Sequence, residues 1–365
     1  MSVCELNNCV GCYACANVCP KKCIDVKDMS IGTIANIDES ACIKCNMCKK
    51  VCQAYNDVEY KQTKYAYEGW VSNDDVRKNA ASGGVASQLI INFIKKGGYV
   101  ASCIFKDGEF KFKLSNNMDD VSLFRGSKYV KSKPYYIYSE VKKCLENNKV
   151  LFIGLPCQVA GLYLFLKEKN INNLYTIDLI CHGSPTQNIF QNYYYEMNTR
   201  KLESYQTINF RKKHNYQVYC DDKALEFEGV QDPYIIAFLE GINYSENCYS
   251  CKYARIERIS DITLGDSWAY DAKDASKGVS LMLIQTEKGN ELIEDESIIK
   301  KKTSIDVAIK TNHQLEHPTF KHPKRDYFFE KYERLGFKKT IRKSLPKKYY
   351  KQQIKKIMIK FKIYK

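Results

Sequence analysis

The sequence predicts an α/β protein, α+β overall, in which a small cysteine-rich domain precedes a larger core with a mixed or parallel sheet. Two observations predict this class. Eight cysteines recur at one spacing before residue 60, and short apolar runs alternate with helical patterns from residue 65 to residue 286. The 365 residues, of which 44% are hydrophobic, suffice for two or three domains. We place the segments at 1–60, 65–135, 136–335 and 336–365.

The first segment contains two runs of four cysteines with the same spacing, C-x2-C-x2-C-x3-C. They are Cys9, Cys12, Cys15 and Cys19, followed by Cys42, Cys45, Cys48 and Cys52. This spacing is typical of two-cluster ferredoxins, in which the last cysteine of each run binds the cluster of the other run. We therefore expect one [4Fe-4S] cluster on Cys9, Cys12, Cys15 and Cys52, and a second on Cys42, Cys45, Cys48 and Cys19. Pro20 fits the pattern, whereas Gln53 after Cys52 departs from it.

Two other uses of these cysteines fit less well. Zinc sites need only four thiolates, usually from C-x2-C pairs, so the third close cysteine of each run would be surplus. A disulfide framework needs an oxidising compartment, whereas residues 1–8 lack the features of a signal peptide. Because no apolar run reaches the length of a membrane span, we expect a cytoplasmic protein. Cys4 and Cys23 lie outside the pattern and are expected to be plain buried thiols.

The net charge of +15 is concentrated at the C-terminal end. The segment Lys338–Lys365 contains twelve Lys or Arg and no Asp or Glu, which leaves 15 − 12 = +3 for the rest of the chain. No zinc-finger, helix-turn-helix or RNA-recognition signature occurs, so we expect no nucleic-acid partner. Within the basic segment Ile354, Ile357, Met358 and Phe361 fall on one helical face. This pattern favours an amphipathic helix on an anionic membrane surface, peripheral on the inner face, although such a charge run can also be merely solvated.

The second segment is expected to begin with a strand at Tyr65–Val71. Ser82, Gly83 and Gly84 then precede a helical pattern that ends at Gly97, and Ser82 is a candidate cap. Glycines at a helix start let an anion such as a diphosphate approach the backbone, but a plain turn has the same sequence. Strands are expected at Tyr99–Phe105 and Phe110–Leu114.

A second candidate ligand-binding stretch is Gly126-Ser127-Lys128-Tyr129. It offers a hydroxyl, a cation and an aromatic plane to a phosphate or a flavin ring, although a solvated loop can have the same composition.

The third segment predicts a βαβ unit. Helix Lys142–Asn148 is followed by strand Val150–Gly154, helix Gln158–Lys169 and strand Tyr175–Ile180. A cysteine follows each strand, Cys157 after the first and Cys181 after the second. Parallel neighbours would bring both thiols to one sheet edge, where ligands bind in such sheets. With Cys248 and Cys251 they make four ligands, enough for a third cluster, whereas the alternative is four separate thiols.

The rest of this segment contributes further candidates. The stretch Phe210–His214 places several cations at a strand end, to hold an anionic substrate or to face solvent. We expect a helix at Pro233–Leu239, a strand and tight turn at Asp261–Trp268, and a core strand at Val279–Thr286. His182 is a candidate proton donor to a reduced substrate, or a residue that hydrogen-bonds near a cluster.

Several of these motifs occur together in a known order. They are Ser82-Gly83-Gly84, Gly126-Ser127-Lys128-Tyr129, Pro156-Cys157-Gln158, Cys181-His182-Gly183, Cys248-x2-Cys251 and Asp261-Ile262-Thr263-Leu264-Gly265-Asp266. In this order, over about Tyr65 to Lys331, they resemble the coenzyme F-420 hydrogenase/dehydrogenase beta-subunit family, including members with a fused two-cluster ferredoxin at the N-terminus.

The resemblance implies an iron–sulfur flavoprotein oxidoreductase. It implies a core [4Fe-4S] cluster on Cys157, Cys181, Cys248 and Cys251, and FAD near Ser82, Gly83, Gly84, Ser127, Lys128 and Tyr129. Electrons would pass between ferredoxin-linked clusters and a small-molecule substrate, in deazaflavin-related or surface-polysaccharide metabolism, with ferredoxin or another redox protein as partner. The alternatives are a non-catalytic electron-transfer subunit that docks on a separate reductase and a membrane-surface scaffold with structural clusters.

Overall fold

The computed structural model describes residues 1–167, 171–268 and 275–363. The strands are β1 Ile24–Met29, β2 Gly32–Ile37, β3 Tyr65–Val71, β4 Tyr99–Lys106, β5 Glu109–Ser115, β6 Val150–Gly154, β7 Leu174–Leu179, β8 Ile208–Lys212, β9 Asn215–Cys220, β10 Lys223–Ala224, β11 Ile262–Asp266, β12 Ser280–Ile284 and β13 Ile298–Thr303. The helices are α1 Ala14–Val18, α2 Met47–Lys50, α3 Asp74–Lys78, α4 Val85–Lys95, α5 Val121–Phe124, α6 Ile137–Cys144, α7 Pro156–Leu166, α8 Gln187–Met197, α9 Pro233–Leu239, α10 Glu287–Ile293, α11 Ile305–Thr311, α12 Arg325–Leu335, α13 Phe337–Ser344 and α14 Pro346–Lys360.

The core is organised around one mixed sheet with the strand order β13-β3-β12-β11-β7-β6-β4-β5. Strands β4, β6, β7 and β11 are parallel neighbours, while β12, β3, β13 and β5 pair antiparallel. All five residues of β6 are buried, because apolar helices such as α7 cover a parallel sheet. The predicted α/β class with a mixed sheet is therefore confirmed.

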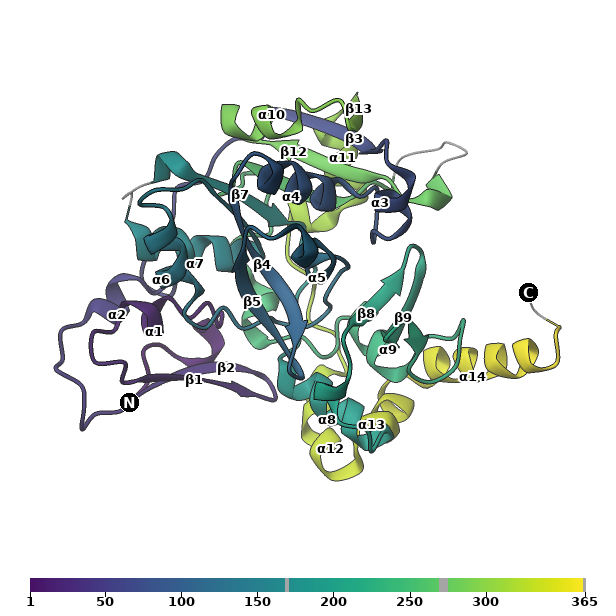
Figure 1. Ribbon diagram of the computed structural model, residues 1–365. Helices are drawn as coiled ribbons and strands as arrows, with labels where there is room; N and C mark the ends of the chain where they lie inside the picture. The colour runs from purple at the N-terminus through teal and green to yellow at the C-terminus, as the bar shows by residue number, and fades with distance from the viewer. Residues whose placement is uncertain (168–170, 269–274, 364–365) are drawn as a thin grey trace.

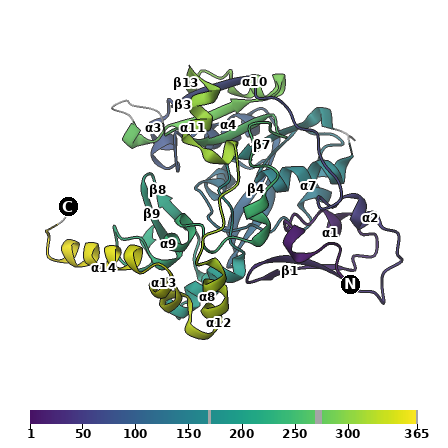
Figure 2. The same ribbon diagram turned by 180° about the vertical axis from the view of Figure 1, so that it is seen from behind.

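The N-terminal domain is a β1–β2 hairpin with two short helices. It lies beside α6 and α7, whereas α14 extends from the opposite side of the molecule (Figures 1 and 2). The polar stretch after it is tied to the core, because Lys61 and Arg258 exchange backbone hydrogen bonds of 2.6 and 2.9 Å.

Most predicted elements form within a residue or two of the expected bounds, and three differ informatively. Helix α7 begins at Pro156, since proline suits the first turn of a helix; its expected end, Lys169, lies outside the described residues. Helix α6 ends at Cys144, earlier than expected. Gly84, with φ of 88°, precedes α4 in the cap position, so the expected cap by Ser82 is wrong.

The basic C-terminal segment divides into two parts. Phe337, Ile341, Leu345 and Tyr349 are buried in the same cluster as Tyr234, because their spacing of four residues forms one apolar stripe. Beyond Tyr349, helix α14 is largely exposed. Only this second part projects from the core, which differs from the expectation for the whole segment. None of the described helices is both long and apolar enough to cross a membrane.

Candidate functional site: three groups of cysteines

The core thiol group consists of the four cysteines predicted for a third cluster. Cys157 lies in the first turn of α7 after β6, and Cys181 follows β7, so the parallel pairing of β6 with β7 brings both to one sheet edge. Cys248 and Cys251 come from a short helical turn at Glu246–Ser250 and its end. All four line one cavity of about 280 Å³. The topology therefore brings the four cysteines to the lining of one cavity.

Two buried cations border this cavity. Lys131 is 4% exposed, and its Nζ lies 3.4 Å from Asn247 Oδ1. Arg258 forms a 2.8 Å ion pair with Asp178 of β7, in which both side chains are at most 2% exposed. The guanidinium also donates to the Tyr253 carbonyl at 2.7 Å, so it anchors the chain after Cys251 to the sheet.

The charges around Lys131 favour a cation there. Burial by itself lowers the pKa of Lys131, but the thiolates of Cys248 and Cys157, then Asp28 and Cys9, raise it above its usual value. Conversely, burial raises the pKa of the Cys181 thiol to about 12. A buried thiolate therefore needs positive charge nearby, which Lys131 and a bound metal can supply.

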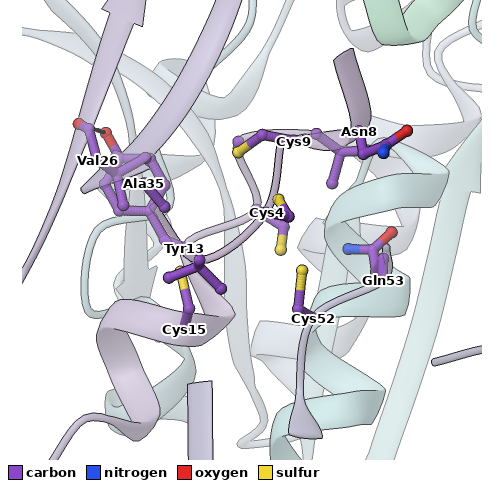
Figure 3. A pocket seen from close by; sticks show the side chains of 13 residues that line it. Cys4, Asn8, Cys9, Tyr13, Cys15, Val26, Ala35, Cys52 and Gln53 are labelled. Atoms are coloured by element: carbon purple, nitrogen blue, oxygen red, sulfur yellow. Dashed lines mark hydrogen bonds between the residues drawn. The ribbon is translucent and has the colours of Figure 1, made fainter. Parts of the chain in front are cut away.

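The inner thiol group lies in the N-terminal domain. Cys9, Cys12, Cys15, Cys52 and the additional Cys4 line a cavity of about 20 Å³, and Figure 3 shows Cys4 between Cys9 and Cys52. Hydrogen bonds from the Cys4 thiol lower the pKa of Cys9 and lower that of Cys52 to about 7. The structure thus brings Cys52 to the first cysteine run, as the crossed ligand pairing requires.

The outer thiol group contains Cys19, Cys42, Cys45 and Cys48, with Cys23 beside them. The Sγ atoms of Cys19 and Cys23 are 3.5 Å apart, and Cys19 and Cys42 both raise the pKa of Cys48, after the larger effect of burial. Cys45 is exposed and the other three predicted ligands are partly exposed. This group is therefore the one at the protein surface.

The inner and core groups are in direct structural contact. The Gln53 side chain, next to Cys52, donates to the Cys157 carbonyl at 2.7 Å and accepts from Tyr253 Oη at 2.6 Å. On α7, a Cβ added to Gly161 would lie 2.8 Å from Cys12 Cβ. The Gln53 side chain thus joins the two domains, which the proline expected after Cys52 could not do. At position 161, only glycine lets Cys12 pack so closely.

The residues predicted near a flavin form a turn and a loop that meet at one arginine. Arg211 donates to the Ala81 carbonyl at 2.5 Å, to Tyr129 Oη at 3.4 Å and, through two nitrogens, to Asp266 at 2.7 and 2.8 Å. Lys213 Nζ donates to the Ser82 carbonyl at 3.0 Å. The structure therefore brings the Ser82 and Tyr129 segments together beneath two cations of the predicted basic stretch.

Several groups in these segments already have partners. Ser82 Oγ donates to the Val279 carbonyl at 2.8 Å, and the Gly83 amide donates to Ser280 Oγ at 3.1 Å. Lys128 Nζ donates to the Phe124 carbonyl at 3.1 Å, and burial lowers its pKa. The Tyr129 ring stacks on Phe238 at 4.3 Å. A flavin that contacts these residues would therefore displace some of these bonds.

His182 follows Cys181 and lines the core cavity. Gln314 Nε2 lies 2.6 Å from His182 Nδ1 and donates to it, which places the proton of the neutral ring on Nε2. Burial, and then the nearby His313, lower the pKa of His182 to about 4. Gln314 Oε1 is buried with no hydrogen-bond partner among the described residues. At neutral pH His182 is thus a neutral hydrogen-bond donor.

Soft thiolates are the ligands that iron–sulfur clusters and zinc prefer. Within residues 1–167, 171–268 and 275–363, no three His, Cys, Asp or Glu side chains converge tightly enough to hold a single ion. Cluster ligands bind different corners of a cube and stand farther apart. The core cavity has room for this arrangement, whereas at the inner group the thiols must separate, because about 20 Å³ holds about one water molecule.

Three functional candidates were missed by sequence reasoning. They are Lys131, Arg258 and Cys4, of which the first two line the core cavity and the third the inner one. Lys131 carries no signal of its own in the sequence, because its burial is visible only in the structure.

The comparisons with known proteins agree with this architecture. A family model for the C terminus of the "Coenzyme F420 hydrogenase/dehydrogenase, beta subunit" matches residues 147–306, which contain all four core cysteines. A chain of the F420-reducing [NiFe] hydrogenase complex from Methanosarcina barkeri is similar in fold, with a TM-score of 0.51 and 17% identity over 76% of this chain and 95% of that chain. No curated protein matches the chain. Residues 147–306 are thus similar to the C-terminal part of the coenzyme F420 hydrogenase/dehydrogenase beta subunit.

Proposed function

We propose that this protein is an iron–sulfur flavoprotein oxidoreductase that passes electrons between [4Fe-4S] clusters and a two-electron donor or acceptor through FAD. The observation that carries the proposal is the core thiol group, in which cysteines from three parts of the chain line one cavity next to the inner thiol group. The family of residues 147–306 supports a redox role.

The cysteine side chains are the proposed ligands. Cys157, Cys181, Cys248 and Cys251 would hold the core cluster, and the crossed sets described above would hold the inner and outer clusters. Bound clusters supply single-electron steps, and FAD converts them into two-electron chemistry. Lys131 and Arg258 would supply positive charge to the core ligands as thiolates, while Gln53 and Gly161 hold the inner and core groups together.

The proposed flavin ligands remain Ser82, Gly83, Gly84, Ser127, Lys128 and Tyr129. Lys213 supports this placement, because it brings positive charge to the Ser82 turn, where a diphosphate would need it. The charge of Arg211 at the same turn is paired with Asp266. The N–H of the neutral His182 ring would hydrogen-bond to a substrate at the core cavity. To act as the proton donor, His182 would first have to take up a second proton, against its lowered pKa.

Cofactor content tests this proposal directly. Protein purified without oxygen should contain about twelve irons and one FAD per chain, as three clusters and one flavin require. Colourless protein, or protein that holds only zinc, would refute it.

The alternative is a subunit that transfers electrons to a separate reductase and binds no substrate. It is favoured by the similar chain, which belongs to a hydrogenase complex. Eight irons and no flavin would support it. Reduction of a small-molecule acceptor by the purified protein alone would exclude it. Coenzyme F-420, followed by its absorbance, is the first acceptor to test, and precursors of surface polysaccharides come next.

We also propose that α14 binds an anionic membrane surface. Tyr350, Ile354, Ile357 and Phe361 form one stripe and are each at least 52% exposed, while lysines flank the stripe. Because Phe337 and Ile341 are buried in the core, removal of the whole segment would damage the fold. The better test is Ile354→Ser with Ile357→Ser, which should abolish binding to phosphatidylserine vesicles, whereas the exposed Ile299→Ser should not.

A further inference from the structure

The outer thiol group is the natural entry point for electrons from another protein. Cys45 is exposed, and Cys19, Cys42 and Cys48 are partly exposed, whereas the inner cysteines Cys9, Cys12 and Cys15 are buried. Electron transfer between proteins needs a short distance between the two redox centres. A docking surface would therefore cover the outer group.

Lysines are concentrated around this group. Residues 1–60 contain six lysines and seven acidic residues. Five of the six lysines are within two or three positions of a predicted outer ligand, and all five are exposed: Lys21, Lys22, Lys44, Lys49 and Lys50. We call these five residues the lysine rim.

Two acidic residues near the rim form ion pairs with groups outside it. Glu39 forms a 2.8 Å ion pair with the N-terminal amine, and Asp25 pairs with Lys27 at 3.0 Å. Asp38 accepts a 2.7 Å hydrogen bond from Ser40 Oγ, and this bond lowers its pKa. In the described part of the chain, no ion pair involves a lysine of the rim. The rim therefore presents five positive charges that no direct ion pair neutralises in the described residues.

Two exposed apolar side chains lie in the same segment as three of the rim lysines. Ile43 is 57% exposed and Met47 is 38% exposed, and each is adjacent in sequence to a predicted ligand. Figure 1 places α2, which begins at Met47, at the outer edge of the N-terminal domain, away from the core sheet. A small apolar centre with a charged rim is the usual anatomy of a transient protein interface.

We propose that the lysine rim, with Ile43 and Met47, docks a small acidic protein that carries one electron at a time. This inference rests on the proposed function and adds the class of partner and its binding surface. In the forward direction the carrier is oxidised by one electron and the group bound by the outer thiols is reduced by one, with no bond formed or broken. An acidic carrier fits because its charge complements the rim.

The experiment measures binding of a purified two-cluster ferredoxin of net negative charge to the full-length, anaerobically prepared protein. The test variant is Lys44→Glu with Lys50→Glu. The matched control is Lys301→Glu with Lys310→Glu, which changes the net charge equally at two exposed positions on β13 and α11. A basic cytochrome c serves as the carrier of opposite charge, and phosphatidylserine vesicles as a non-protein anionic surface.

At low ionic strength the dissociation constant of the acidic ferredoxin should rise about tenfold in the test variant and less than about twofold in the control. The difference should shrink at roughly 0.5 M salt, where exposed charges are screened. Iron content and the electron paramagnetic resonance spectrum should match those of the wild type, because neither substitution removes a ligand.

If the test and control variants weaken ferredoxin binding equally, the proposed docking surface is wrong. The proposed function still stands in that case, provided that the wild-type protein contains iron. The docking surface is equally excluded if wild-type protein binds the basic cytochrome as tightly, or if the test variant loses only vesicle binding. Wild-type protein without iron would overturn the proposed function, and the inference with it.

Discussion

The outer and core thiol groups each contain four candidate ligand cysteines, but their environments are opposite. The outer cysteines are exposed or partly exposed and are surrounded by lysines of the surface. The core cysteines line a cavity between two domains, with Lys131 buried beside them. Solvent stabilises charge at the outer group, whereas protein groups must do so at the core. The exposed outer group is therefore suited to docking another protein, whereas the buried core group is suited to a reaction away from solvent.

Substitution of one candidate ligand cysteine should have the largest effect, and the effect should differ between the core group and the outer group. Cys181→Ser and Cys45→Ser should each lower the iron content by about four of about twelve per chain. Only Cys181→Ser should also lower the melting temperature clearly, because the remaining core thiols stay buried without the metal's charge. Iron assay and calorimetry measure the two effects, with Cys144→Ser on α6 as the control that retains all iron. Equal melting temperatures for the two variants would contradict the contrast in environments.

The second-largest effect should come from the contact that Gln53 makes between the two domains. Gln53→Leu removes hydrogen bonds to the Cys157 carbonyl and Tyr253 Oη, which should lower the free energy of unfolding by roughly 1–3 kcal/mol, since the buried partners lose their donor and acceptor. Chemical denaturation under nitrogen measures this change. In a double-mutant cycle with Tyr253→Phe, additive effects would show that the two side chains do not cooperate.

Lys131 should produce the smallest and most selective effect. Lys131→Met removes a positive charge and so makes the core cluster harder to reduce. A charge at roughly 8 Å and an effective dielectric constant of about 20 contributes about 2 kcal/mol, or roughly 90 mV for one electron. A redox titration followed by electron paramagnetic resonance should show this negative shift at the core and none at the outer group. Lys131→Arg keeps the charge and should restore the potential; a shift of equal size in that variant would exclude an electrostatic cause.

Much of the fold was predictable because its signals are local. The runs Val150–Gly154 and Tyr65–Val71 form strands with the expected bounds, and Pro233–Leu239 forms the expected helix. The order of the strands in the sheet was not predictable, since pairing such as β3 with β12 joins residues more than 200 positions apart. Likewise, the apolar stripe Phe337–Tyr349 was overlooked among lysines, although burial in the core depends on it.

The sequence by itself determined which cysteines are the candidate ligands, because their spacing is a local pattern: the two runs and the pair Cys248 and Cys251 are visible without coordinates. Only the tertiary structure decided how those sets relate. Gln53 meets Cys157 across 104 positions, and Lys131 reaches the core cavity from a separate loop. The physical reason is that ligand spacing is a property of one loop, whereas burial and charge around a thiol depend on every segment that packs against it.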